Sequence, residues 1–203
     1  FILSKGHASI GAYSVMHHLG FISKKAYDSF CNFNSNLGGH PDSTKMPIFN
    51  FSTGSLGHGL PNSSGLAYAL KQKKSKKKVI CLIGDQELME GTTWESLHII
   101  ENYKIKNLIL IIDRNKSDFR SIRFLEIKKK LSVFSDKIHE INGHNLLEIK
   151  DVLKKSLTNK SFNIIIANTV KGYGIKSIKN NPAWHHKSPT TEELKNFKKE
   201  LCL

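Results

Sequence analysis

The sequence predicts an α/β protein built on a doubly wound parallel sheet with helices on both faces. Several short runs are almost entirely apolar, as in strands that are covered on both sides: "VICLI" (79–83), "NLILIID" (107–113) and "FNIIIANTV" (162–170). Segments with helical spacing separate these runs, and strand–helix–strand alternation is typical of parallel sheets. With 203 residues, the chain is long enough for one sizeable core, so we expect a single domain over residues 1–203.

The spacing of apolar residues predicts most of the other elements. The expected helices cover residues 7–21, 23–33, 60–72, 89–104, 145–157 and 190–201. Ser23 is expected to cap the second of these helices, and Thr190 or Thr191 the last. A further strand, "HEING" (139–143), is expected toward the edge of the sheet. Residues 34–59 are rich in Gly, Pro, Ser and Asn, which predicts a long irregular segment of the kind that is often functional.

Composition excludes some classes of protein. The apolar fraction of 39% and the charged fraction of 24% are those of a folded globular chain. The formal net charge is +14, but 28 lysines accompany only three arginines, and recognition of nucleic acid usually favours the bidentate arginine fork. Nucleic acid is therefore not the partner we expect. The strongest basic run, "KQKKSKKK" (71–78), is interpreted as a solvated loop, with an anionic partner as the alternative.

The cysteines indicate a reducing compartment. Cys31, Cys81 and Cys202 are odd in number and widely spaced, which predicts neither a disulfide framework nor a zinc site. Cys81 falls inside an apolar strand pattern and is expected to be a small buried residue. We expect neither a membrane span nor a signal peptide. The expected location is the cytoplasm.

Oxygen-bearing side chains follow two of the predicted strands. Asp85 comes directly after the first strand, and Asn115 follows the second, thirty residues later. Ligands bind parallel sheets beyond the carboxyl ends of the strands, and such hard oxygen ligands suit Mg²⁺ or Ca²⁺. Because Mg²⁺ usually takes further ligands from phosphates, the pair favours a bound diphosphate-like group. The alternative is that Asp85 caps a helix and Asn115 forms a turn.

A set of motifs carries a resemblance to a known family. In chain order they are "LSKGHAS", "GGHP", "STGSLGHGL", "GDQELMEGTTWE", "IIDRN", "NTVKGYG" and "AWHHKSPT". Together they resemble the N-terminal, thiamine-diphosphate-binding part of transketolase, and most of all the separate N-terminal subunit of split transketolases. The resemblance covers essentially the whole chain. Its motifs are individually modest and jointly specific.

The resemblance implies a set of site residues. Asp85 and Asn115 would be side-chain ligands of Mg²⁺ (or Ca²⁺), with the backbone carbonyl of Ser117 as a third ligand. Histidines around the reacting atoms would be His7, His40, and His185 or His186. The residues implied to contact thiamine diphosphate are His7, Gly54, Leu56, Gly57, Gly84, Asp85, Gln86, Glu90, Asn115 and His186. Four histidines outside the motifs are expected to have surface or packing roles: His17, His18, His98 and His144.

The chain also departs from the family pattern. Gln86 stands where the family has a glycine beside the diphosphate, and His58 replaces a glutamine. After Asn115 the family has a short glycine-containing loop, whereas this chain has "KSDFRSIRFLEIKKKLSVF" (116–134). The sequence opens inside the first motif, so we expect that it lacks the family's usual N-terminal segment, as a fragment or a truncated paralogue.

The resemblance also implies an activity and a partner. The expected reaction is transfer of a two-carbon ketol unit from a ketose phosphate to an aldose phosphate. No part of the sequence resembles the family's pyrimidine-binding domain, so a separate C-terminal subunit is expected to supply it, in an oligomer such as a heterotetramer. The alternatives are a catalytically silent, basic binding protein and another thiamine-dependent enzyme, such as a deoxyxylulose-phosphate synthase or a 2-oxo acid dehydrogenase component.

Overall fold

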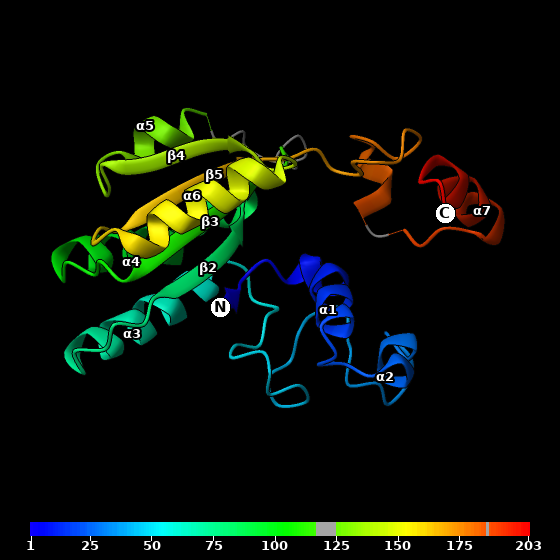
Figure 1. The fold of residues 1–203 in the computed structure, drawn as a ribbon, viewed down its shortest axis with the longest axis horizontal. Helices are drawn as coiled ribbons and strands as arrows, with labels where there is room; N and C mark the ends of the chain where they lie inside the picture. The colour runs from blue at the N-terminus through cyan, green and yellow to red at the C-terminus, as the bar shows by residue number, and fades with distance from the viewer. Residues whose placement is uncertain (117–124, 186) are drawn as a thin grey trace.

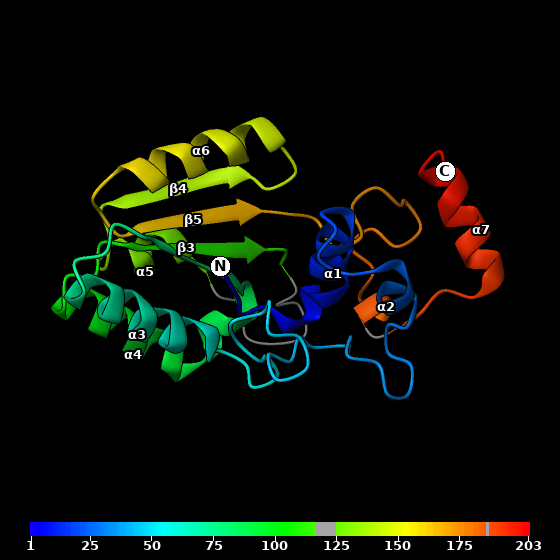
Figure 2. The same cartoon turned by 60° about the horizontal axis from the view of Figure 1, so that its bottom comes forward.

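The fold is a five-stranded parallel sheet with helices on both faces, which confirms the predicted class. The computed structural model describes residues 1–116, 125–185 and 187–203. The strands are β1 (Ile2–Leu3), β2 (Val79–Gly84), β3 (Leu108–Arg114), β4 (Lys137–Asn142) and β5 (Asn163–Asn168). The strand order is β1-β2-β3-β5-β4, and every neighbouring pair is parallel. All carboxyl ends therefore lie at one edge of the sheet, and the arrowheads of β3, β4 and β5 in Figure 2 point toward α1.

Six of the described α-helices fall in the predicted segments or extend one residue beyond them, and four of these are shorter than predicted. The α-helices are α1 (Ser9–His18), α2 (Lys24–Asp28), α3 (Gly59–Gln72), α4 (Gly91–Asn102), α5 (Ile127–Leu131), α6 (Leu146–Thr158) and α7 (Thr191–Glu200). Short 3-10 helices are η1 (Gly6–Ala8), η2 (Asp85–Met89) and η4 (Pro182–His185). The expected caps form: Ser23 accepts a hydrogen bond from the backbone N–H of Ala26, and Thr190 accepts one from that of Glu193.

Alternating strand residues place two cores on the two faces of the sheet. Cys81, Leu110 and Ile164 belong to the core under α3, α4 and α5. Ile109 and Ile165 pack on the other face, against Val152 of α6. Figure 1 labels these elements, and Figure 2 shows α6 across the sheet from α3 and α4. A third cluster, around Tyr13 and Leu37, joins α1 to the irregular segment beyond the sheet edge.

Two elements differ from the sequence expectation. The sequence does not predict β1, because two residues are too few to show a strand pattern, yet Ile2 and Leu3 pair with Cys81 and Leu82. No helix is predicted in the segment after Asn115, where the family has a short loop, but this segment includes α5, because Ile127 and Leu131 are buried in the core. Residues 117–124 of that segment lie outside the described residues.

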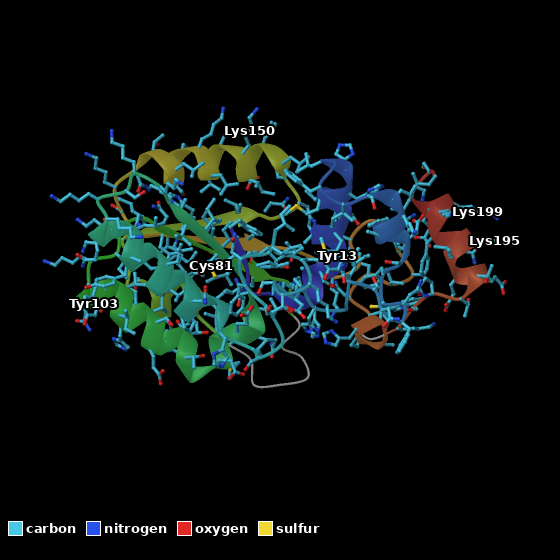
Figure 3. The ribbon with its side chains drawn as sticks, turned by 90° about the horizontal axis from the view of Figure 1, so that it is seen from below. Tyr13, Cys81, Tyr103, Lys150, Lys195 and Lys199 are labelled. Atoms are coloured by element: carbon cyan, nitrogen blue, oxygen red, sulfur yellow. The ribbon has the colours of Figure 1, made fainter. Side chains whose placement is uncertain are left out.

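Cys81 is a buried core residue, as expected. It has no exposed surface, and burial raises the pKa of its thiol to about 12, so it is unreactive at neutral pH. Figure 3 places its label among the strands. All three cysteines are free. Within the described residues, no helix combines the length and the apolar character that a bilayer crossing requires.

Candidate active site at the carboxyl edge of the sheet

A cavity of about 740 Å³ lies at the carboxyl edge, and all five strands lead into it. The segments that leave β1, β2 and β3 contribute Ser4–His7, Gly84–Glu87, and Asp113 with Asn115. The segments that leave β4 and β5 contribute residues 143–144 and 169–172. The rest of its wall comes from His40, Gly54–Leu56, Trp184 and His185. Parallel sheets bind ligands at this edge, where the chain leaves regular structure.

The two proposed metal ligands line the same cavity. Gly84 pairs with Asp113 across β2 and β3, so Asp85 and Asn115 leave neighbouring strand ends. Asp85 is only 5% exposed, and one of its carboxylate oxygens accepts a hydrogen bond from the backbone N–H of Lys116 at 2.8 Å. This bond ties the end of β2 to the chain just beyond Asn115. The predicted third ligand, Ser117, lies outside the described residues.

Three of the four predicted catalytic histidines gather in the wall. The ring centroids of His7 and His40 are 5.1 Å apart, and those of His7 and His185 are also 5.1 Å apart. His7 follows β1, His40 lies in the irregular segment, and His185 ends η4, so the cluster joins three distant parts of the chain. His186 lies outside the described residues.

α1 and Gly6 fix the position of His40. The side chains of Ser9 and Tyr13, both on α1, donate hydrogen bonds to the backbone carbonyls of Gly39 at 2.8 Å and Gly38 at 3.1 Å. A Cβ on Gly6 would lie 2.3 Å from Cδ2 of His40, so only glycine allows this approach. The "KGH" and "GGHP" motifs are therefore packed directly against each other.

The predicted cofactor contacts divide into two groups. Gly54, Leu56, Gly84 and Gln86 line the cavity, as do His7, Asp85 and Asn115. Gly57 and Glu90 lie beside it and contact each other, since a Cβ on Gly57 would come within 2.5 Å of the Glu90 Cβ. Gly57 has a φ of 79°, a left-handed conformation that glycine adopts without strain.

Several lining residues were not assigned from the sequence. Lys5 forms an ion pair with Asp113, which also accepts a hydrogen bond from the Thr169 hydroxyl. Lys171 lies 2.5 Å from Nδ1 of His185; because an ammonium group can only donate, Nδ1 accepts, and Nε2 is left as the N–H of that ring. Lys5 belongs to the motif "LSKGH", and Lys171 belongs to the motif "NTVKGYG". Their position, two or three residues after the ends of β1 and β5, is the signal that could have identified them as site residues.

A buried glutamate joins three motifs under the cavity. Glu87 is 1% exposed; Ser4 donates a hydrogen bond to one carboxylate oxygen, and the backbone N–H of Gly84 donates to the other at 2.8 Å. Ser4 in turn accepts from the backbone N–H of Gly59 at 3.0 Å. Burial raises the pKa of Glu87, although hydrogen bonds from Ser4, Gly84 and Gly57 oppose the rise.

The four histidines outside the motifs have the predicted surface and packing positions, with one addition. His17 stacks on Tyr27, His98 packs edge-on against Phe134, and His18 lies on α1. His144 stacks on Tyr173 with a centroid distance of 3.8 Å, and its Nε2 accepts a hydrogen bond from the backbone N–H of Val170 at 2.8 Å. It also lines the cavity, so its packing role shapes the site.

A divalent cation with a diphosphate fits these residues. Among the described residues, no three His, Cys, Asp or Glu side chains are arranged to hold a metal ion. A cation here would therefore have Asp85 and Asn115 as side-chain ligands and would take others from phosphate oxygens, which is common for Mg²⁺. Lys171 adds positive charge to the same wall, whereas the charge of Lys5 is paired with that of Asp113. The residues present suit a metal–diphosphate ligand better than a metal alone.

Comparison with known proteins places this chain in a family. The family model described as transketolase, thiamine diphosphate binding domain, matches residues 1–203. One of the subunits of the apulose-4-phosphate transketolase of Actinobacillus succinogenes is 38% identical, over 99% of this chain and 75% of that protein. The corresponding subunit of the Phocaeicola vulgatus enzyme, which has the same name, is 33% identical, over 99% of this chain and 73% of its own length.

A solved structure has the same fold. The crystal structure of transketolase from Campylobacter jejuni superposes with a TM-score of 0.91 at 27% identity, over all of this chain. The chain spans 34% of that protein's length, about a third. These relatives are named as transketolases, which are thiamine-dependent transferases. The chain therefore belongs to the transketolase family, as a thiamine diphosphate-binding domain whose similar relatives include subunits of split enzymes.

Proposed function

We propose that this chain is the thiamine-diphosphate-binding subunit of a two-subunit transketolase. The enzyme would transfer a two-carbon ketol unit from a ketose phosphate to an aldose phosphate. A separate C-terminal subunit would supply the pyrimidine-binding domain, in an oligomer such as a heterotetramer in the cytoplasm. The observation that carries the proposal is the meeting of Asp85, Asn115 and three histidines around one cavity at the carboxyl edge.

In this proposal the strand ends bind the cofactor. Asp85 and Asn115, with Ser117, would hold Mg²⁺ (or Ca²⁺) against the diphosphate, and Leu56, 46% exposed at the cavity, offers an apolar surface for a ring. Lys5 is held by Asp113, so its charge is fixed close to the end of β2. Thiamine diphosphate, when bound, supplies an electron sink that allows a carbon–carbon bond beside a carbonyl to break.

The histidines would handle the protons of the sugar. Ketol transfer requires protons to leave and return to hydroxyl groups, and imidazoles titrate in the range where such transfer is easy. The Nε2–H of His185 can donate a hydrogen bond to a sugar hydroxyl or carbonyl while Lys171 fixes the ring. His7 lies between His40 and His185, so the three rings can serve neighbouring oxygens of one substrate.

The names of the relatives suggest a substrate. Two of them are called apulose-4-phosphate transketolases, which makes apulose 4-phosphate the first ketose donor to test for this chain, with xylulose 5-phosphate as the second. The carboxyl-edge cavity, at about 740 Å³, is large enough for a cofactor and part of a sugar phosphate.

Calorimetric titration with thiamine diphosphate tests the metal-dependent site. Binding to the chain with its partner subunit should require Mg²⁺ and should weaken at least about a hundredfold in Asp85→Ala, because the cation would lose a charged ligand. Asp151→Ala, an exposed aspartate on α6, is the matched control and should bind normally. Equal binding by Asp85→Ala and wild type would contradict the proposal.

The partner requirement has its own test. The purified chain with thiamine diphosphate and Mg²⁺ should show no ketol transfer from either ketose phosphate until the C-terminal subunit is added. Robust turnover by the chain alone would show that the two-subunit part of the proposal is wrong.

A further inference from the structure

A second cavity lies at the opposite, amino edge of the sheet, and lysines surround it. It has a volume of about 320 Å³. Four of its lysines come from the run 71–78 before β2, namely Lys71, Lys74, Lys76 and Lys78. Lys104 and Lys106 come from the turn before β3, and Lys160 from the turn before β5. We call this set of seven lysines the lysine hollow.

The topology of the sheet creates the lysine hollow. β2, β3 and β5 are consecutive neighbours in the sheet, so the turns that precede them meet although they are far apart in sequence. The run at 71–78 is therefore one of three chain segments that form a larger basic site, and it contributes four of the seven lysines. Figure 3 shows Tyr103, which precedes one of these turns, at the end of the molecule opposite Lys195 and Lys199.

The lysine hollow has uncompensated positive charge. No aspartate or glutamate contributes to its described lining, and none of the seven lysines forms an ion pair with a described carboxylate. Like charges gathered around one small volume repel one another, and this cost falls when an anion enters. Partial burial also lowers the pKa of Lys78, because burial disfavours the charged form of its ammonium group.

Helix capping accounts for two of the seven lysines. Lys71 donates a hydrogen bond to the carbonyl of Tyr103 at 2.6 Å, at the end of α4. Lys78 donates to the carbonyl of Ser156 at 2.9 Å and to that of Asn159, at the end of α6. Cations stabilise helix carboxyl ends, so these two need no ligand. The other five lysines have no such partner among the described residues.

We propose that the lysine hollow binds a small, multiply charged phosphate anion carrying a diphosphate or triphosphate group. Lysine ammonium groups bind phosphates as point charges, and a cavity of about 320 Å³ suits a compact ligand. The described lining contains neither arginine nor an aromatic ring, so it offers no bidentate base contact and no surface for base stacking. A compact anion therefore fits better than a nucleic acid strand.

The test is an NMR titration of the nitrogen-15-labelled chain with inorganic triphosphate in buffer free of Mg²⁺. Saturable shifts are expected for the backbone amides of residues 73–78, 103–107 and 159–161, which locates binding away from the carboxyl-edge cavity. Shifts confined to residues 84–86 and 113–116, or the lack of saturable binding below about 1 mM, would overturn the proposal.

Two matched triple variants distinguish binding at a specific site from general attraction to a positively charged surface. The hollow variant is Lys76→Gln, Lys106→Gln and Lys160→Gln, which takes one lysine from each turn and spares the caps and the left-handed residues Lys74 and Lys104. The control is Lys150→Gln, Lys195→Gln and Lys199→Gln, on α6 and α7 (Figure 3), with the same change in charge. Both sets are exposed, so both variants should retain the wild-type melting temperature.

Triphosphate affinity should fall at least about tenfold in the hollow variant and stay within about twofold in the control. Equal losses in the two variants would show diffuse attraction to a basic surface and would overturn the proposal. A short DNA duplex that binds more tightly than triphosphate through the same three lysines would replace it with a nucleic acid surface. None of these outcomes depends on ketol transfer. The test of the lysine hollow is therefore independent of the proposed function.

Discussion

The two edges of the same sheet are built in different ways. At the carboxyl edge, long-range contacts bury polar groups: Glu87 joins Ser4 to Gly84, and Lys5 is paired with Asp113. At the amino edge the turns are short, the charges are exposed, and the clearest bonds are lysine caps on helix ends, such as that of Lys71. The carboxyl edge is thus specified by buried hydrogen bonds and close packing, and the amino edge by charge. Changes at the first should cost far more stability than changes at the second.

The largest expected effect is the loss of Glu87. Glu87→Ala leaves buried donors on Ser4 and Gly84 without an acceptor, which should lower the free energy of unfolding by about 2–4 kcal/mol. Urea denaturation measures this. Glu101→Ala, an exposed glutamate of α4, is the control and should change it by less than about 0.5 kcal/mol. Similar losses of unfolding free energy in both variants would contradict the expectation that the buried glutamate contributes more to stability than the exposed one.

A pair of glycines on α3 sharpens the comparison within one helix. Gly59→Ala would place a Cβ 2.1 Å from the Ser4 side chain at the carboxyl edge, which should cost about 2 kcal/mol of stability. Gly65→Ala has no atom within 4 Å of the new Cβ and should stabilise the helix by about 0.5–1 kcal/mol. Thermal and urea unfolding should therefore shift in opposite directions. Two shifts of the same sign would mean that packing against Ser4 is not decisive.

The raised pKa of Glu87 predicts a pH dependence. Burial disfavours its ionised form, so the stabilisation that Glu87 contributes is fully present below its unfolded pKa of about 4.3 and is lost as the pH rises through the folded pKa. Glu87→Gln cannot ionise. The unfolding free energy of wild type minus that of Glu87→Gln should decrease from about pH 4 toward neutrality, as urea unfolding at several pH values would reveal. Parallel pH profiles would contradict this.

The smallest effect is expected at the amino edge. Lys71→Met removes the cap on the Tyr103 carbonyl and should lower the unfolding free energy by about 0.5 kcal/mol. Lys77→Met, in the same basic run but outside the lysine hollow, should leave it unchanged. A loss as large as that of Glu87→Ala would show that the amino edge is also specified by tight structural contacts.

Local sequence patterns determined most of the strands and part of the candidate site. The apolar runs fixed β2, β3 and β5, because strands covered on both faces need apolar side chains at every position. The polar residues that follow the first two runs, Asp85 and Asn115, identified the carboxyl edge, since parallel strands all end on one side. The motif resemblance added His7, His40 and His185, and the structure brings all three to the same cavity.

Tertiary structure alone decided the rest. β5 lies between β3 and β4, which brings Thr169 to Asp113 and Lys171 into the wall, and no local pattern specifies that order. β1 is two residues long, yet its pairing with β2 delivers Lys5 and His7 to the site. The lysine hollow exists only because three neighbouring strands begin together. Strand order depends on pairing between distant segments, and local residue spacing carries no information about which strands pair.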